Sequence, residues 1–231
     1  MSLPKINTPI YELKLPSSGN TIRYRPFLVK EHKILLTLQN ADNSEVSKIV
    51  EELVRVCTFD KLNISMLPHF DIEYIFLHLR AKSIGETVDV VVNCECGNKI
   101  DASFNIEDVR VEKPLEHSNK IKLNEEYGVE MSYPKFNEVV KVFESNDTEE
   151  VINLILKNIV GVFDNENYWN IKEQTKEEVE EFVNSLTKDQ FDKIENFFVT
   201  SPKIVQQIET DCPKCGRHNI SRLEGLGNFF V

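Results

Sequence analysis

The sequence predicts an α+β protein in which two cysteine-tipped β-hairpins are interrupted by a helical insertion, with an N-terminal hairpin and three helices ahead of the first cysteine pair. Apolar residues alternate with a period of two around each cysteine pair and recur at helical spacing elsewhere. We expect a single unit over residues 1–231, with the N-terminal hairpin and first helices in 1–66. The two cysteine hairpins are expected in 67–111 plus 202–231, and the insertion in 112–201.

The composition is that of an ordinary globular chain. Hydrophobic residues make up 41% and charged residues 28%, and eight glycines and nine prolines are too few for disordered, collagen-like or low-complexity classes. The net charge of −11 disfavours a nucleic-acid partner, because a phosphate-binding surface would oppose the average field of the protein. No apolar run approaches the roughly 18 to 20 residues of a membrane span, and the first residues contain no apolar signal core. We therefore expect a soluble protein that stays in a reducing cytosol.

The first predicted elements are a hairpin and a helix. Residues 10–15 and 21–25 flank a cluster of turn formers at 16–20, which predicts two paired strands. An apolar stripe at near-helical spacing then runs from Phe27 and ends around Asn40.

Two more helices are predicted before the first cysteine pair. Apolar residues over 46–57 recur at helical spacing behind the cap candidates 42–44, which places Cys57 on the core face as a small buried side chain. A third helix is expected over 71–83, with apolar side chains on one side, and Gly85 closes it. Alternation then begins, leading into and out of the first cysteine pair.

The insertion is predicted to hold one hairpin followed by three or four helices. The hairpin covers 121–123 and 129–133 and is stopped by Pro134. Three pairs have the spacing of a capping box and mark helix starts, namely Asp147 with Glu150, Thr175 with Glu178, and Thr187 with Gln190. We place Ile159 and Val160 on the apolar face of the first of these helices. Residues 204–210 return to extended structure.

Four of the five cysteines form two pairs, each at a predicted hairpin tip and each followed by glycine. They are Cys94 and Cys96, then Cys212 and Cys215. Tetrahedral zinc needs four thiolates from two directions, and glycine suits the left-handed backbone of such a turn. The pairs are separated by 115 residues, which suits a zinc-ribbon-like site interrupted by an insertion. We predict one structural zinc ion per chain.

Three alternatives compete with the zinc site: free thiols, one redox dithiol, or disulfides. A redox dithiol ordinarily lies between a strand and a helix, whereas residues 216–222 after the second pair are predicted to form a strand. His218 is an alternative ligand in place of one cysteine.

A site closed by four thiolates leaves no open position for catalysis. The remaining histidines, His32, His69, His78 and His117, are scattered and show no spacing of a metal site or a catalytic triad. We expect no enzyme activity and no small-molecule substrate.

Several short motifs, in order along nearly the whole chain, resemble the baseplate hub proteins of T-even-type contractile-tailed phages. They are residues 25–31 (RPFLVKE), 70–74 (FDIEY), 79–86 (LRAKSIGE), the Cys94/Cys96 pair, 186–191 (LTKDQF), 197–198 (FF) and 212–216 (CPKCG). The resemblance implies a structural or assembly component of the tail baseplate that is made in the host cytoplasm, contacts other hub proteins and lacks a catalytic role.

Three alternatives to a virion hub subunit stay open. The first is an assembly chaperone of the hub that is absent from the mature particle, the second is a zinc-ribbon protein that binds nucleic acid, and the third is a metal hydrolase. The second needs a basic patch, whereas four cationic and four acidic side chains surround the cysteine pairs. A metal hydrolase would need an open coordination position and a general base.

The carboxyl-terminal segment 223–231 is predicted to dock on a neighbouring tail protein. It places Leu226, Phe229, Phe230 and Val231 after flexible glycines, where a free terminus is ordinarily polar. The alternative is that its aromatic side chains fold back onto the core of the protein itself.

Overall fold

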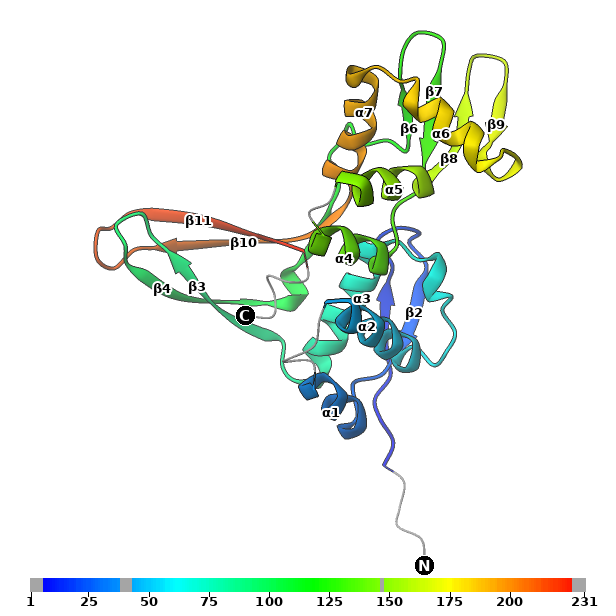
Figure 1. Cartoon of the computed structure of the whole chain (residues 1–231). Helices are drawn as coiled ribbons and strands as arrows, with labels where there is room; N and C mark the ends of the chain where they lie inside the picture. The colour runs from blue at the N-terminus through cyan, green and yellow to red at the C-terminus, as the bar shows by residue number, and fades with distance from the viewer. Residues whose placement is uncertain (1–5, 38–42, 146–147, 226–231) are drawn as a thin grey trace, which may run out of the picture. The chain divides into compact units, whose positions relative to one another are not determined.

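The computed structural model describes residues 6–37, 43–145 and 148–225, and its mixture of helices and small sheets confirms the α+β class (Figure 1). The chain forms two compact units: unit 1 comprises residues 1–112 and 203–231, and unit 2 comprises 113–202. Within the described part of the chain, no helix combines the length and the apolar character that a membrane span requires.

Unit 1 begins with the predicted hairpin and three helices. The elements are β1 (Tyr11–Lys14), β2 (Thr21–Tyr24), α1 (Val29–Thr37), α2 (Asn43–Cys57), a 3-10 turn η2 (Ile64–Met66) and α3 (His69–Ser83). The strands β1 and β2 pair antiparallel, with Tyr11 opposite Tyr24. Cys57 is fully buried at the end of α2, as its place on the apolar face predicts, and burial raises the pKa of its thiol to about 11.

Helix α3 confirms the third predicted helix and the burial of its apolar residues, but the burial extends beyond one side. Eleven of its 15 residues are buried, among them Asp71 and His78. The reason is that α3 contacts α2, the 3-10 turn η3 (Ile106–Asp108) and β10 (Lys203–Asp211), so that few of its side chains reach solvent. Asp71 is satisfied inside the protein, because its carboxylate accepts hydrogen bonds from the backbone amide of Ser17 at 3.0 Å and from the Ser17 hydroxyl.

The segment between β2 and α1 is fixed by a buried ion pair. The Nη2 of Arg25 lies 3.0 Å from Oε1 of Glu31, and the other carboxylate oxygen accepts a hydrogen bond of 2.7 Å from the backbone amide of Leu28. The backbone amide of Arg25 donates to the carbonyl of Cys57, which joins this segment to α2. The motif at residues 25–31 therefore has a structural role in unit 1.

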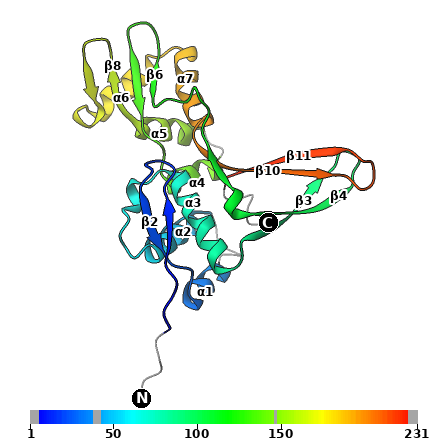
Figure 2. The same cartoon turned by 180° about the vertical axis from the view of Figure 1, so that it is seen from behind.

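The remaining strands of unit 1 form what we call the cysteine arm, defined as β3 (Thr87–Asn93), β4 (Lys99–Asn105), β10 and β11 (His218–Glu224). The strands β3 and β4 pair antiparallel, as do β10 and β11, and β5 (Arg110–Glu112) pairs with the other edge of β10. The two hairpins lie side by side with β4 against β10, as both views of the fold show (Figures 1 and 2). Buried Val88, Val92, Phe104 and Ile208 belong to these strands.

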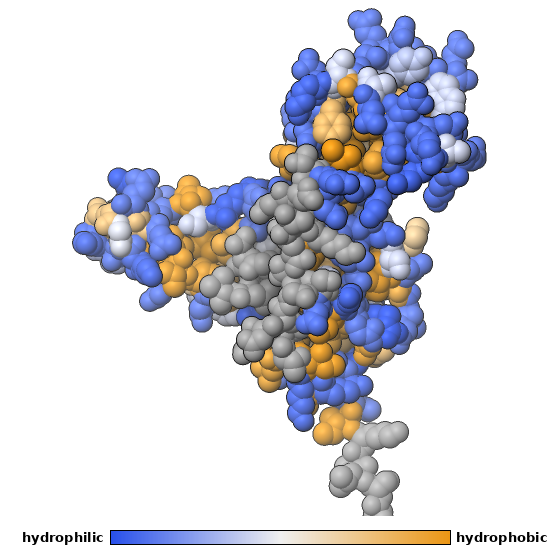
Figure 3. Space-filling view, in the orientation of Figure 1, coloured by the Kyte–Doolittle hydropathy of each residue, from blue (hydrophilic) through white to orange (hydrophobic). Residues whose placement is uncertain are grey.

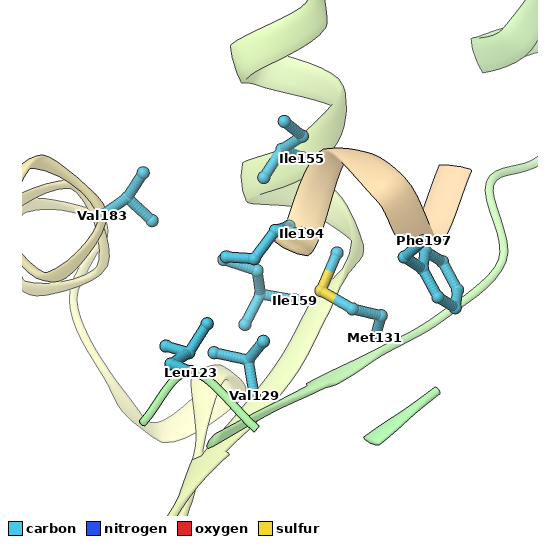
Figure 4. Packing of buried hydrophobic residues seen from close by; sticks show 8 residues of the cluster. All are labelled: Leu123, Val129, Met131, Ile155, Ile159, Val183, Ile194 and Phe197. Carbon is cyan, nitrogen blue, oxygen red and sulfur yellow. The ribbon is translucent and has the colours of Figure 1, made fainter. Parts of the chain in front are cut away.

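Unit 2 is an antiparallel sheet with helices. The order of its strands is β6-β7-β8-β9. The elements are β6 (Lys120–Lys122), β7 (Gly128–Met131), α4 (Phe136–Ser145), α5 (Thr148–Asn158), β8 (Ile159–Phe163), β9 (Tyr168–Asn170), a 3-10 turn η4 (Ile171–Glu173), α6 (Lys176–Asn184) and α7 (Lys188–Val199). Side chains from β7, β8, α5, α6 and α7 meet in one core, which includes Met131, Ile155, Ile194 and Phe197 (Figure 4).

The placement of Ile159 and Val160 on a helix is wrong, because α5 ends at Asn158 and β8 begins at Ile159. The carbonyl of Asn158 accepts a hydrogen bond of 2.7 Å from the backbone amide of Ser132, which turns the chain toward β7. The following residues are mostly β-branched and include Gly161, a composition that favours a strand over a helix. Strands β8 and β9 were not among the predicted elements.

Two of the three predicted capping boxes are confirmed. Thr175 caps α6 with Glu178 reaching back, and Thr187 caps α7 with Gln190 in the same role. Asp147 of the third pair lies outside the described residues, and α5 begins directly after it, at Thr148.

Candidate metal centre

The four paired cysteines lie together at the tip of the cysteine arm. Cys94 and Cys96 occupy the turn between β3 and β4, and Cys212 and Cys215 the turn between β10 and β11. The Sγ atoms of all four lie within 4.8 Å of one another. Cys94 and Cys215 are 3.7 Å apart, and so are Cys96 and Cys212. The fold thus closes the 115-residue gap in the sequence and brings the two pairs face to face.

The two turns are built alike. In the first, the amide of Gly97 donates to the carbonyl of Cys94 at 2.9 Å, and in the second the amide of Gly216 donates to the carbonyl of Cys212 at 2.8 Å. Both glycines have a positive φ, 81° at Gly97 and 71° at Gly216. Other residues adopt this left-handed conformation only with strain, so the glycine after each pair sets the turn that presents the sulfur atoms.

Hydrogen-bond donors point at the sulfur atoms. Burial raises the pKa of Cys212. Hydrogen bonds from the backbone amides of Cys215 and Lys214 and from the neighbouring thiols lower it by more, so that the pKa falls to about 6. The side-chain amide of Asn98 also lies 3.7 Å from this sulfur. The amide of Arg217 favours a thiolate at Cys215, yet the neighbouring cysteines outweigh it and raise its pKa to about 12. The thiolate of Cys212 therefore forms readily, and a cation among the four sulfur atoms would favour deprotonation of the other three thiols.

Two of the six distances between the sulfur atoms match a tetrahedral thiolate site, and all six are 4.8 Å or less. Four ligands at a Zn–S distance of about 2.3 Å define a tetrahedron whose edges are about 3.8 Å long, close to the two separations of 3.7 Å. Cys94 and Cys212 are buried, and Cys96 and Cys215 are exposed. The four cysteines can therefore hold one metal ion between the hairpins, with the donor set of a structural site.

The predicted alternative ligand, His218, faces carboxylates. Its Nδ1 lies 2.9 Å from Oδ1 of Asp211, and its Nε2 lies 3.7 Å from a carboxylate oxygen of Glu209. Arg217, in the second cysteine turn, forms an ion pair with Glu95 in the first. Arg217 thus pairs with a charge across the two hairpins, and His218 lies beside acidic groups within its own hairpin.

The other histidines lie apart from the cysteines. His117 in unit 2 is stacked with Tyr133 and Phe197 and forms hydrogen bonds with the Thr200 hydroxyl at 2.9 Å and the Tyr133 hydroxyl at 3.1 Å. His78 is buried in α3, and burial lowers its pKa to about 4. Among residues that the structure describes, the cysteine cluster is the only group of three or more side chains with metal-ligand geometry.

One residue of the site was not predicted. Asn98 is a donor to a ligand sulfur, and its position directly after the glycine of the first turn is the signal that could have identified it. The expected docking residues Leu226, Phe229, Phe230 and Val231 lie outside the described residues.

Comparison with known proteins gives one match. The family model described as T4 bacteriophage base plate protein matches residues 8–231, which is nearly the whole chain and includes both cysteine pairs. No curated protein and no solved structure matches the chain significantly. On the extent of the family match, the chain belongs to the T4 bacteriophage base plate protein family.

Proposed function

We propose that the protein is a structural subunit of the hub of a contractile phage tail baseplate, which acts through contacts with other hub proteins and performs no catalysis. The observation that carries the proposal is the family match over residues 8–231. The closed set of four thiol ligands supports it, because catalytic zinc sites ordinarily keep a position open for water or substrate. The subunit is made in the host cytoplasm and becomes part of the tail.

The proposal includes one structural zinc ion, held by Cys94, Cys96, Cys212 and Cys215. All four donors are sulfur, and this donor set favours zinc over magnesium or calcium. When bound, the ion joins the tips of two hairpins that lie on either side of unit 2 in the sequence, and neutralises part of the thiolate charge.

Elemental analysis of protein purified without chelator tests the metal part of the proposal. We expect about one zinc per chain, and less than one tenth of that in the Cys96→Ser/Cys215→Ser variant. Cys57→Ala is the matched control, because this cysteine is buried against Arg25 away from the cluster. Folded protein that is free of metal and has four reactive thiols at the arm would contradict the zinc site.

Quantitative mass spectrometry of purified phage particles tests the structural part. We expect the chain at a fixed ratio to the other baseplate proteins, and cross-links that join it to hub components. A chain that is required for tail assembly but absent from the finished particle would instead identify an assembly chaperone. Retention on duplex DNA at low salt, which strengthens electrostatic binding, would favour the nucleic-acid alternative.

A further inference from the structure

Unit 2 contains an apolar groove that the proposed function does not use. The groove has a volume of about 460 Å³, and residues of β8, β9, α6 and the start of α7 line it. Val162 of β8 and Trp169 of β9 are paired in register and both line it, opposite Phe182 and Leu186. The groove is an open extension of the core of unit 2, because Val162, Phe182 and Leu186 also pack against that core.

Two aromatic side chains at this groove are exposed to solvent. Trp169 is 39% exposed and Tyr127, in the turn between β6 and β7, is 42% exposed. Large aromatic side chains that stay accessible beside a concave apolar surface are typical of the centre of a protein interface. On the face of unit 2 that Figure 3 shows, hydrophobic surface is limited to areas enclosed by hydrophilic residues.

The border of the groove is acidic. Exposed carboxylates lie on the groove lining or next to lining residues in the sequence, namely Glu125, Glu126, Glu173, Glu177 and Glu178. Hydrogen bonds from the backbone and side chain of Thr175 hold the pKa of Glu178 below its ordinary range, so it is charged at neutral pH. Three exposed lysines lie beside the same lining: Lys122 and Lys172 next to lining residues in the sequence, and Lys193, whose Nζ donates to the carbonyl of Leu123 at 2.7 Å. The acidic groups therefore outnumber the basic ones.

The whole of unit 2 is negatively charged, like the border of the groove. Unit 2 contains 10 lysines and 19 acidic residues, a net charge of −9, and so holds most of the −11 of the chain. Two nearby lysines are paired within their own helices, Lys176 with Glu180 and Lys188 with Asp192. A cationic partner would thus be attracted over a distance of about one Debye length before it made contact.

We propose that this groove binds a segment of another protein in which one or two large apolar side chains are flanked by lysine or arginine. The apolar side chains fill the groove beside Trp169, and the flanking cations face the carboxylates of the β6–β7 turn and of the start of α6. This function is separate from the metal site, which belongs to unit 1, and it does not depend on the hub assignment.

The single tryptophan of the protein makes the groove directly observable, since Trp169 is the only source of indole emission. The probe is a synthetic peptide, acetyl-Lys-Lys-Leu-Phe-Leu-Lys-Lys-amide, which contains no tryptophan or tyrosine. One control peptide replaces each lysine with glutamate, and another keeps the lysines but replaces the apolar residues with serine. We expect a saturable blue shift of Trp169 emission with the probe, and affinities at least about tenfold weaker for both controls.

Variants locate the binding. With a fluorescein-labelled probe, Trp169→Ala is expected to lower the affinity roughly tenfold, as loss of an aromatic contact at an interface centre does. The E125Q/E126Q double variant changes only exposed side chains, and it should weaken binding severalfold and reduce its salt dependence. The matched control is E149Q/E150Q on α5, which removes the same charge from unit 2 outside the groove lining and should bind like the unmodified protein.

Three outcomes would overturn the proposal. The first is equal binding of the lysine and glutamate peptides, and the second is probe binding that neither Trp169→Ala nor E125Q/E126Q weakens. The third comes from sedimentation of the full chain: self-association that Trp169→Ala abolishes would assign the groove to a second copy of this protein.

Discussion

Unit 1 and unit 2 both combine antiparallel strands with helices, but unit 1 has three small sheets and unit 2 has one, and the two units differ in what holds them together. Unit 1 contains all five cysteines and is nearly neutral, with 17 basic and 19 acidic residues. Unit 2 contains no cysteine and has a net charge of −9. Its stability must come from apolar packing, because it has no crosslink to oppose the repulsion among its carboxylates.

The difference is clearest in the cysteine arm. Each of its hairpins has only two strands and a mostly polar outer face. One β-branched apolar side chain is exposed on each, Val91 on β3 and Ile220 on β11. The arm buries Val88, Val92, Phe104 and Ile208, but two-stranded hairpins are marginally stable on their own and are ordinarily supported by a metal or a disulfide. In unit 2, by contrast, eight buried side chains from the sheet and helices form one contiguous cluster. We therefore expect metal to control the arm and packing to control unit 2.

We expect loss of the metal to have the largest effect, and to affect the cysteine arm but not unit 2. Structural zinc supplies on the order of 10 kcal/mol of apparent binding free energy in small sites, so Cys212→Ser should unfold much of the arm. Hydrogen exchange should then show lost protection in β3, β4, β10 and β11, and unchanged protection in β7 and β8. Chelation of the unmodified protein should have the same effect. Equal loss of protection in both units would contradict the division that we infer.

The converse experiment removes core volume from unit 2. Ile194 is fully buried on α7, and Ile194→Ala should lower the free energy of unfolding of unit 2 by about 2–5 kcal/mol. Protection in β7 and β8 should fall, whereas the zinc content and the protection of the cysteine arm should stay unchanged. Val199→Ala, at a position on the same helix that is 66% exposed, is the control and should have little effect on either unit. Loss of zinc from the Ile194 variant would show that the units are not independent.

Glycines sharpen the comparison because the two units need them for different reasons. A Cβ at Gly128 would lie 2.3 Å from the ring of Phe163 and 2.8 Å from the carbonyl oxygen of Ile121, so Gly128→Ala should destabilise unit 2 by about 1–3 kcal/mol through overpacking. At Gly216 a Cβ meets nothing within 4 Å, but φ is +71°. Gly216→Ala should therefore cost about 1–2 kcal/mol through backbone strain.

Asparagine separates these two causes. It tolerates the left-handed conformation better than alanine, so Gly216→Asn should recover part of the zinc affinity that Gly216→Ala loses. Gly128→Asn should be worse than Gly128→Ala, since it is larger. Thermal unfolding followed by hydrogen exchange in each unit measures both. An asparagine that fails to rescue position 216 would indicate that strain is not the reason for this glycine.

Features that depend on local chemistry were predictable from the sequence. Each cysteine pair carries its own turn signal in the glycine that follows it, and the capping boxes at Thr175 and Thr187 involve side chains only three residues apart. The hydrophobic period likewise identified α2 and placed Cys57 in the core. These signals involve a few neighbouring residues and are independent of the rest of the fold.

Features that depend on distant pairing were not predictable in the same way. A short apolar run such as residues 159–163 suits a helix or a strand, and only its pairing with β7 decides between them. The burial of α3 on nearly all sides follows from contacts with α2, with η3 and with β10, the last of which lies more than a hundred residues further along the chain. The groove of unit 2 combines residues of β8, β9, α6 and α7, so no motif in the sequence could reveal it.

The smallest expected effect is the response of unit 2 to mild acid through His117. Burial, assisted by the charge of Lys113, lowers the pKa of this imidazole below its ordinary value. The unfolded chain therefore binds the proton first as the pH falls. The stability that the neutral ring contributes is fully present above the ordinary histidine pKa of about 6.5, and it is lost as the pH falls from there toward the lower pKa of the folded state.

An NMR titration of the His117 ring should thus give a midpoint below that of an unfolded peptide, and the unfolding midpoint of unit 2 should decline over the same range. His117→Phe keeps an aromatic ring beside Phe197 but removes the titrating group and its hydrogen bonds to Thr200 and Tyr133. This variant should be less stable at neutral pH and should show a shallower decline on acidification.

His32→Gln is the control, because His32 is an exposed residue of unit 1, and it should keep the original slope. Because any metal bound by the thiolates of unit 1 would also be released in acid, the two responses are distinguished by measuring zinc content at each pH. A steep acid response of unit 2 that persists in His117→Phe would mean that its carboxylates, and not this histidine, control it.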